Sequence, residues 1–228
     1  MEDFIKTFGS IDVLINNAGG ALQIPGGSKG EFKDMPMEYW DSQIALNLNS
    51  AAYLSRYAVA DMIEKKTEGR IVNISSIHGQ VTWVHRRMLP YSAGKGGLNM
   101  FTKALGVEVA KYGIRVNAVA PGLIFTKVIS RYSEKDLQAF AHKIPVGRGG
   151  TVEEIVPMIQ FLADVEKARF IVGQVICVDG GQSSDGSIES MNFEPRLRRA
   201  ISIAPSRSMS TPSLAAERTT ISESCSGE

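Results

Sequence analysis

The sequence predicts an α/β protein organised around a doubly wound parallel sheet. Short apolar segments alternate with longer stretches of helical periodicity from residue 12 to residue 178, and this alternation favours parallel strands joined by helical crossovers. The chain has 228 residues, of which 43% are hydrophobic, which is enough to build one core if the sheet is complete. One folded domain is therefore expected.

The elements follow in order along the chain. Strands are expected near residues 12–16, 70–75, 115–119 and 174–178, and helices near residues 37–66, 91–111, 133–143 and 151–162. The first strand opens onto small residues, the second ends in hydroxyl groups, and the third runs into a Pro-Gly turn. Small residues at a strand end let a ligand approach the backbone closely.

The most informative segment is Tyr-Ser-Ala-Gly-Lys at residues 91–95. Residues four apart lie on one face of a helix, so Tyr91 and Lys95 are expected side by side. A nearby cation favours phenolate over phenol, which would bring the pKa of Tyr91 closer to neutral than its reference value of about 10. Such a pair suits reversible carbonyl and alcohol chemistry. Taken alone, the spacing also fits an amphipathic helix whose Tyr caps a core while its Lys extends to solvent.

Four motifs occur in a fixed order along the chain. They are Asn-Asn-Ala-Gly at residues 16–19, Asn-x-Ser-Ser at 73–76, Tyr-x-x-x-Lys at 91–95 and Pro-Gly at 121–122. Together they resemble the short-chain dehydrogenase/reductase family, from Met1 to about Gln182. The resemblance implies a Rossmann-like domain over residues 1–182. The loop before Tyr91 resembles the glucose dehydrogenase-like branch, which implies interconversion of a small alcohol, sugar or polyol and its carbonyl compound.

The resemblance also implies a catalytic tetrad of Asn47, Ser76, Tyr91 and Lys95. Tyr91 would be the general acid in reduction and the base in oxidation, and the Ser76 hydroxyl would hydrogen-bond the substrate oxygen. Lys95 would lower the pKa of the tyrosine and hold the nicotinamide ribose. Asn47 would fix a water that links Lys95 to solvent. Ser75 is interpreted as a bystander.

The implied cofactor is NAD or NADP, and the sequence favours neither. Its expected contacts are Asn16, Ala18, Gly19, Tyr91, Lys95, Pro121, Gly122, Ile124 and Thr126. The Gly-rich turn and helix that normally receive the pyrophosphate are not found before Asp12. Residues 26–30 are glycine-rich but lack the spacing of a phosphate-binding turn, so we interpret them as a flexible loop.

The family domain is therefore expected to be N-terminally truncated, without its first three strands and half of the cofactor cleft. The strand at residues 13–15 would then lie at an exposed edge of the sheet, and an unpaired apolar edge invites self-association. Two functions remain open. One is an active oxidoreductase, and the alternative is a catalytically inactive truncated isoform that acts only through subunit association.

Composition and charge limit the classes of partner and the cellular location that the sequence predicts. A net charge of +1 does not indicate nucleic acid or an anionic membrane. No apolar run reaches the roughly 18 residues of a membrane span, and the N-terminus lacks the layout of a signal peptide. Two cysteines are too few for a disulfide framework, and no metal site is expected. We expect a cytoplasmic protein with a small alcohol or carbonyl compound as substrate.

Like subunits are also expected as partners, in a dimer or tetramer. In the family two long helices, here around residues 51–62 and 98–109, pack against their copies. Small residues on these helices would permit a close approach: Ala51, Ala52, Ala58, Ala60, Ala104 and Gly106.

The C-terminal residues 183–228 are rich in Ser, Thr, Arg and Pro, and are expected to form a disordered tail. Within it, Ser210 follows Arg207 by three residues and precedes Pro212 by two. This spacing resembles the phosphoserine motif read by 14-3-3 proteins, and the resemblance implies a phosphoserine-binding partner at Ser210.

Overall fold

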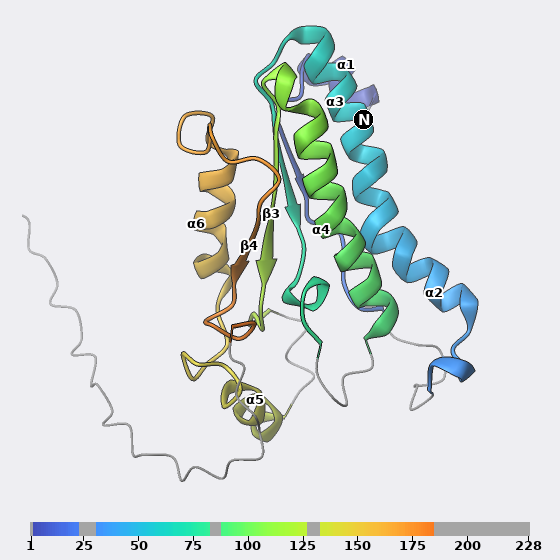
Figure 1. Ribbon diagram of the computed structural model, residues 1–228, viewed down its shortest axis with the longest axis vertical. Coiled ribbons are helices and arrows are strands. Elements are labelled where there is room, and N and C mark those ends of the chain that lie inside the picture. The colour runs from blue at the N-terminus through green and yellow to red at the C-terminus, as the bar shows by residue number, and fades with distance from the viewer. Residues whose placement is uncertain (1, 23–30, 83–87, 127–132, 185–228) are drawn as a thin grey trace, which may run out of the picture. The chain divides into compact units, whose positions relative to one another are not determined.

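The computed structural model describes residues 2–22, 31–82, 88–126 and 133–184. These residues belong to one compact unit, residues 1–187. The expected tail beyond residue 184, with Ser210, and the glycine-rich residues 26–30 lie outside the described residues. The described sheet contains four parallel strands in the order β1-β2-β3-β4 (Figure 1). This arrangement confirms the predicted fold class.

The predicted strands and helices are all present. The strands are β1 (Val13–Asn16), β2 (Arg70–Ile74), β3 (Arg115–Pro121) and β4 (Val175–Val178). The α-helices are α1 (Glu2–Phe8), α2 (Met37–Ile44), α3 (Ser50–Lys65), α4 (Leu89–Val109), α5 (Glu134–Ala141) and α6 (Val152–Ala163). Shorter helical turns are η1 (Phe32–Asp34), η2 (Ala45–Asn49), η3 (Ile77–Gly79) and η4 (Ala110–Tyr112). Along the described ranges, no helix is both long and apolar enough to cross a bilayer.

Two helices differ from the expectation. The single helix expected at residues 37–66 is interrupted by η2, which is a π-helical turn. Helix α4 begins at Leu89 rather than at Tyr91, because Pro90 occupies one of its first positions, where a missing N–H removes no helical hydrogen bond. The earlier start places Tyr91 within the first turn of α4.

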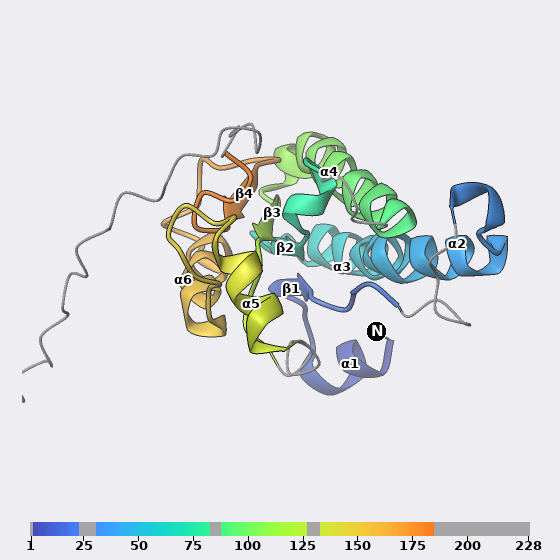
Figure 2. The same ribbon diagram turned by 90° about the horizontal axis from the view of Figure 1, so that it is seen from below.

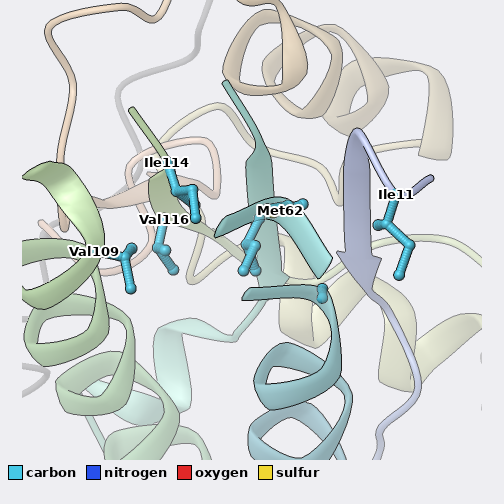
Figure 3. Close-up of a cluster of buried hydrophobic side chains, with 7 residues drawn as sticks. Ile11, Met62, Val109, Ile114 and Val116 are labelled. Carbon is cyan, nitrogen blue, oxygen red and sulfur yellow. The ribbon is translucent and has the colours of Figure 1, made fainter. Parts of the chain in front are cut away.

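One face of the sheet is covered by α3 and α4, whereas α6 lies on the opposite face (Figure 2). On the first face, Met62 of α3 and Val109 of α4 are fully buried against Ile114 and Val116 (Figure 3). Ile5 of α1 packs against the same cluster. This densely packed layer supports α4, which carries Tyr91 and Lys95, and α3, which follows directly after the turn η2 with Asn47.

The opposite face is only partly covered. Helix α6 buries Ile155 and Leu162 over the middle of the sheet, against Val72 of β2. Strand β1 lies at the edge of the described sheet, and its outward side chains Val13 and Ile15 are 41% and 45% exposed. An apolar edge at residues 13–15 is thus found where the sequence predicts one.

Candidate active site

The site is built where parallel strands end. Strands β1, β2 and β3 point their carboxyl ends toward the region where α4 begins (Figure 1), and ligands of open parallel sheets bind outside such ends. The chain leaving β2 provides Ser76, and the first turns of α4 provide Tyr91 and Lys95. Asn47 comes from η2.

Tyr91 and Ser76 are brought together as predicted. Their side chains share a hydrogen bond. Ser76 is only 7% exposed, and its Oγ also accepts from the His78 backbone N–H at 3.2 Å, which caps η3. The His78 ring meets the Tyr91 ring edge-on, with 6.0 Å between ring centroids. The phenol is therefore fixed beside the Ser76 hydroxyl.

Lys95 is buried, with 3% of its surface exposed. Its Nζ lies 6.0 Å from the centroid of the Tyr91 ring and donates to the backbone oxygen of Ile74 at 2.7 Å. An ammonium has three donors, and within the described residues this is the single hydrogen bond that Nζ makes. Lys95 does not extend to solvent, so the amphipathic-helix alternative is wrong for this residue.

The pKa of Tyr91 shifts opposite to the expectation. Burial raises the pKa of Tyr91 above its ordinary value, and the hydrogen bond with Ser76 only partly offsets that rise. Desolvation of the phenolate sets the direction of the shift, although the Lys95 Nζ lies 6.0 Å from the ring centroid. Burial also lowers the pKa of Lys95 to about 8. In this structure the tyrosine is thus held as a phenol, and the lysine is an ammonium below a pH of about 8.

The side chain of Asn47 is hydrogen-bonded to the loop that follows β1. It is 1% exposed, its Oδ1 accepts from the Gly20 N–H at 2.9 Å, and its Nδ2 donates to the Gly20 oxygen at 3.1 Å. The π-helical turn η2 carries Asn47, and such turns often occur at functional sites. The Asn47 amide therefore binds both polar groups of Gly20.

The backbone at Gly19 brings Asn47 and Lys95 to one place. A Cβ added to Gly19 would lie 2.9 Å from the Lys95 Nζ and 3.1 Å from the Asn47 Oδ1. Both polar atoms thus face the same point of the loop, and a larger residue there would displace them. All four tetrad residues are accordingly gathered around the carboxyl ends of β1 and β2.

The expected cofactor contacts at the end of β1 and just after it differ in which of their atoms are available to a ligand. Asn16 is buried, and its Nδ2 donates to Ser55 at 3.1 Å and to Asn73 at 2.7 Å. Its side chain therefore serves the packing of β1 against α3 and β2, and leaves its backbone for a ligand. Ala18 and Gly19 are exposed.

The remaining cofactor candidates lie in the segment that ends β3. Pro121 pairs with Val178 of β4. Gly122 lies so close to β4 that a Cβ on it would be 2.7 Å from the Asp179 Cβ. Ile124 forms a bridge with Gly150, and Thr126 is exposed at the end of a described range. Whether these residues contact a cofactor stays a prediction.

Three polar residues around the tetrad were missed by the sequence reasoning. Asn99 accepts a hydrogen bond from Ser75 and donates to the Gly79 oxygen at 3.2 Å, which ties down the residue interpreted as a bystander. Gln43 accepts from Asn47, and His78 contacts the Tyr91 ring. Asn99 follows Lys95 by four residues and Gln43 precedes Asn47 by four, so helical spacing was the available signal.

Comparison with known proteins identifies the family. Residues 1–183 match the family model described as Enoyl-(Acyl carrier protein) reductase. The 3-oxoacyl-[acyl-carrier-protein] reductase FabG of Buchnera aphidicola subsp. Baizongia pistaciae is 40% identical over 183 residues, which cover 78% of this chain and 69% of that protein.

Solved structures agree with this match. ElxO with NADP bound has a TM-score of 0.72 and 32% identity, covering 81% of this chain and 72% of that one. A gluconate 5-dehydrogenase from Burkholderia cenocepacia J2315, in complex with NADP and tartrate, has a TM-score of 0.71 and 28% identity, covering 81% of this chain and 69% of that one. The chain belongs to the short-chain dehydrogenase/reductase family, and is by family an oxidoreductase that acts on CH–OH groups.

Proposed function

We propose that this chain interconverts a small alcohol, sugar or polyol and its carbonyl compound. It would do so by transferring a hydride to or from a nicotinamide cofactor, NAD or NADP. The observation that carries the proposal is the cluster of Tyr91 with the buried Ser76 and Lys95 at the carboxyl ends of the strands. Two of the similar structures contain NADP, and one of these is a gluconate dehydrogenase.

The residues present fit the nicotinamide end of such a cofactor. The buried Lys95 ammonium has donors that no described residue uses, and ribose hydroxyls are suitable acceptors. Lys95 and Tyr91 would hold the ribose, the backbone of Ala18 and Gly19 would line its path, and the Pro121–Thr126 segment would contact the carboxamide. When bound, the cofactor supplies or accepts the hydride.

The chain's own residues then move one proton. In reduction, the Tyr91 hydroxyl donates its proton to the substrate oxygen, and in oxidation the phenolate takes it back. The Ser76 hydroxyl, which already hydrogen-bonds Tyr91, holds the same substrate oxygen. The Lys95 ammonium stabilises the phenolate left after proton donation. Because burial raises the pKa of Tyr91, the chain without ligand is in the form that donates.

Association with like subunits is part of the proposal. The outer sides of α3 and α4 expose large apolar residues, namely Tyr53, Leu54, Tyr57, Met100 and Val107. Of the small residues expected to permit subunit contact, Ala51, Ala58 and Gly106 are instead buried within the chain. The exposed apolar side chains therefore support a dimer or tetramer better than the small residues do.

The proposal has two further parts. The small number of cysteines supports action in the cytoplasm, and a partner protein would dock at Ser210 when that residue is phosphorylated.

A tyrosine substitution tests the chemistry. Tyr91→Phe removes the phenolic proton alone, so turnover should fall by about 10²- to 10⁴-fold, the usual contribution of a general acid. Cofactor affinity should stay nearly unchanged. The matched control is Tyr112→Phe, which alters an exposed tyrosine in η4 and should leave turnover intact. A Tyr91→Phe variant with wild-type turnover would refute the proposal.

The assay is run on two proteins, because the chain spans 69% of the length of the FabG relative. One is the chain itself, and the other is a fusion in which the Gly-rich first strands of a family member are placed before Met1. We expect the chain itself to bind NAD and NADP weakly by calorimetry, since its motifs contact one end of the dinucleotide. Lys95→Ala should lower turnover and weaken cofactor binding together. Micromolar binding by the chain itself would contradict this expectation.

A further inference from the structure

We propose that Gln43 is a positioning residue, which fixes the orientation of the Asn47 amide and through it the loop that faces Lys95. The kinetic part of this inference rests on the proposed function. Its structural part does not, because it concerns hydrogen bonds that the chain makes without ligand.

The contacts of Asn47 define one orientation of its amide. Its Nδ2 lies 3.1 Å from the Gln43 Oε1, 3.0 Å from the Gln43 backbone oxygen and 3.1 Å from the Gly20 oxygen. All three are acceptors. Rotating the amide by half a turn would place Oδ1 against these oxygens and would leave the Gly20 N–H facing a donor. The Gln43 side chain thus adds an acceptor that opposes the rotated amide.

Helix α4 also packs against the η2 turn that carries Asn47. A Cβ on Gly94 would lie 3.0 Å from the Asn47 Cβ and 3.6 Å from the Gln43 backbone oxygen. Gly94 directly precedes Lys95. The η2 turn therefore packs against the backbone that presents Lys95. The Asn47 Oδ1 and the Lys95 Nζ also face the same point, because a Cβ on Gly19 would lie 3.1 Å from the first atom and 2.9 Å from the second.

Stability does not account for a glutamine at position 43. Its side chain is 0% exposed, and its Nε2 is buried with no hydrogen-bond partner in the described part of the chain. A buried amide satisfied at one end only destabilises a fold relative to an apolar side chain of similar shape. The contribution of Gln43 is therefore the acceptor that it presents to Asn47.

Two substitutions separate positioning from packing. Gln43→Met keeps the length of the side chain and removes both polar groups, whereas Gln43→Glu removes the unpaired donor and keeps an acceptor. The matched control is Gln160→Met, which makes the same change at an exposed position of α6. Each full-length variant is measured by thermal melting and by NMR hydrogen exchange of the Gly20 amide, which donates to Asn47.

We expect Gln43→Met to speed exchange at Gly20 about fivefold, in line with one weakened hydrogen bond, without lowering the melting temperature. Gln43→Glu should melt lower and keep the Gly20 amide protected. Gln160→Met should change neither quantity. In the fusion that completes the cofactor site, Gln43→Met should lower kcat several-fold with little change in KM, because it alters geometry rather than substrate binding.

The outcomes are decisive in both directions. Unchanged exchange at Gly20 in Gln43→Met would overturn the proposal. A Gln43→Met variant that melts lower or fails to fold would assign Gln43 to packing and would overturn it too. Failure of the proposed function looks different: no variant turns over substrate, while Gly20 exchange still reports on Gln43.

Discussion

The two faces of the sheet are packed to different degrees. On the face of α3 and α4, the side chains of Met62 and Val109 are 0% and 1% exposed. On the face of α6, burial is confined to the middle of the sheet, and Val13 and Ile15 at the edge remain 41% and 45% exposed. We call the face of α3 and α4 the closed face and the face of α6 the open face. The helices that carry the tetrad pack on the closed face, so the geometry of the tetrad can form although the open face is only partly covered.

The largest effect should come from a cavity in the closed face. Met62→Ala removes a fully buried side chain and should lower the free energy of unfolding by about 2–5 kcal/mol. The matched change on the other face is Met158→Ala, at a partly buried position packed against the α6 cluster, which should cost clearly less. Urea unfolding of both variants measures the difference. Equal losses would mean that the two faces are equally well packed.

A buried charge on the closed face should make stability depend on pH. Burial lowers the pKa of Lys95 from 10.5 in the unfolded chain to about 8, so between these values the unfolded chain binds the extra proton and stability rises with pH. Lys95→Met removes this penalty and should stabilise the fold below pH 8, by on the order of 3 kcal/mol.

The advantage of Lys95→Met should shrink as the pH approaches 10. Burial raises the pKa of Tyr91, which lowers stability above about pH 10, so the comparison is confined to pH 7–10. Urea unfolding at several pH values in this range checks it. A constant difference between the two proteins would show that Lys95 keeps its proton throughout.

The cap of α6 tests how much the open face relies on one helix. Thr151 and Glu154 form a capping box at the start of α6, and Arg148 pairs with Glu154. Thr151→Ala should lower the free energy of unfolding by about 1 kcal/mol. Val152→Ala, at an exposed position of the first turn, serves as the control. A loss confined to the control would contradict the role of the cap.

The smallest effect on stability is expected at the edge strand. Ile15→Lys places a charge on a half-exposed side chain, so the free energy of unfolding should change by less than about 1 kcal/mol. Self-association should nevertheless decrease, because charges on an edge strand discourage pairing with another chain. Sedimentation at several concentrations measures this. Unchanged association would place the contact elsewhere, and the exposed side chains of α3 and α4 would be tested next.

Much of the fold could be predicted because each strand has a strong apolar signal. The strand at residues 70–75 is a run of buried residues, and β2 forms there as Arg70–Ile74. Three tetrad residues could be placed because two motifs fix them at strand and helix ends. Asn47 could be assigned to the same site only through the family resemblance, because residues 45–49 around it have the composition of an ordinary helix.

What could not be predicted depends on burial and on contacts distant in sequence. The pKa of Tyr91 was expected to fall because Lys95 is near in sequence, but the extent of desolvation is set by the folded surroundings. Asn16 was predicted as a cofactor contact without a side-chain role, and its side chain donates to Ser55 and Asn73, which lie 39 and 57 residues away. Partners so far apart leave no local pattern in the chain.

The turn at Ala45–Asn49 also changes how this segment should tolerate insertions and deletions. Removing one residue from an α-helix rotates everything beyond it by about 100° and misplaces its buried face. A π-helical turn already contains one residue more than the regular helix around it. Deleting Ala45 would therefore leave a continuous α-helix in which the buried sides of α2 and α3 keep their relative phase, whereas the amide of Asn47 would lose the π-helical turn that holds it opposite Gly20.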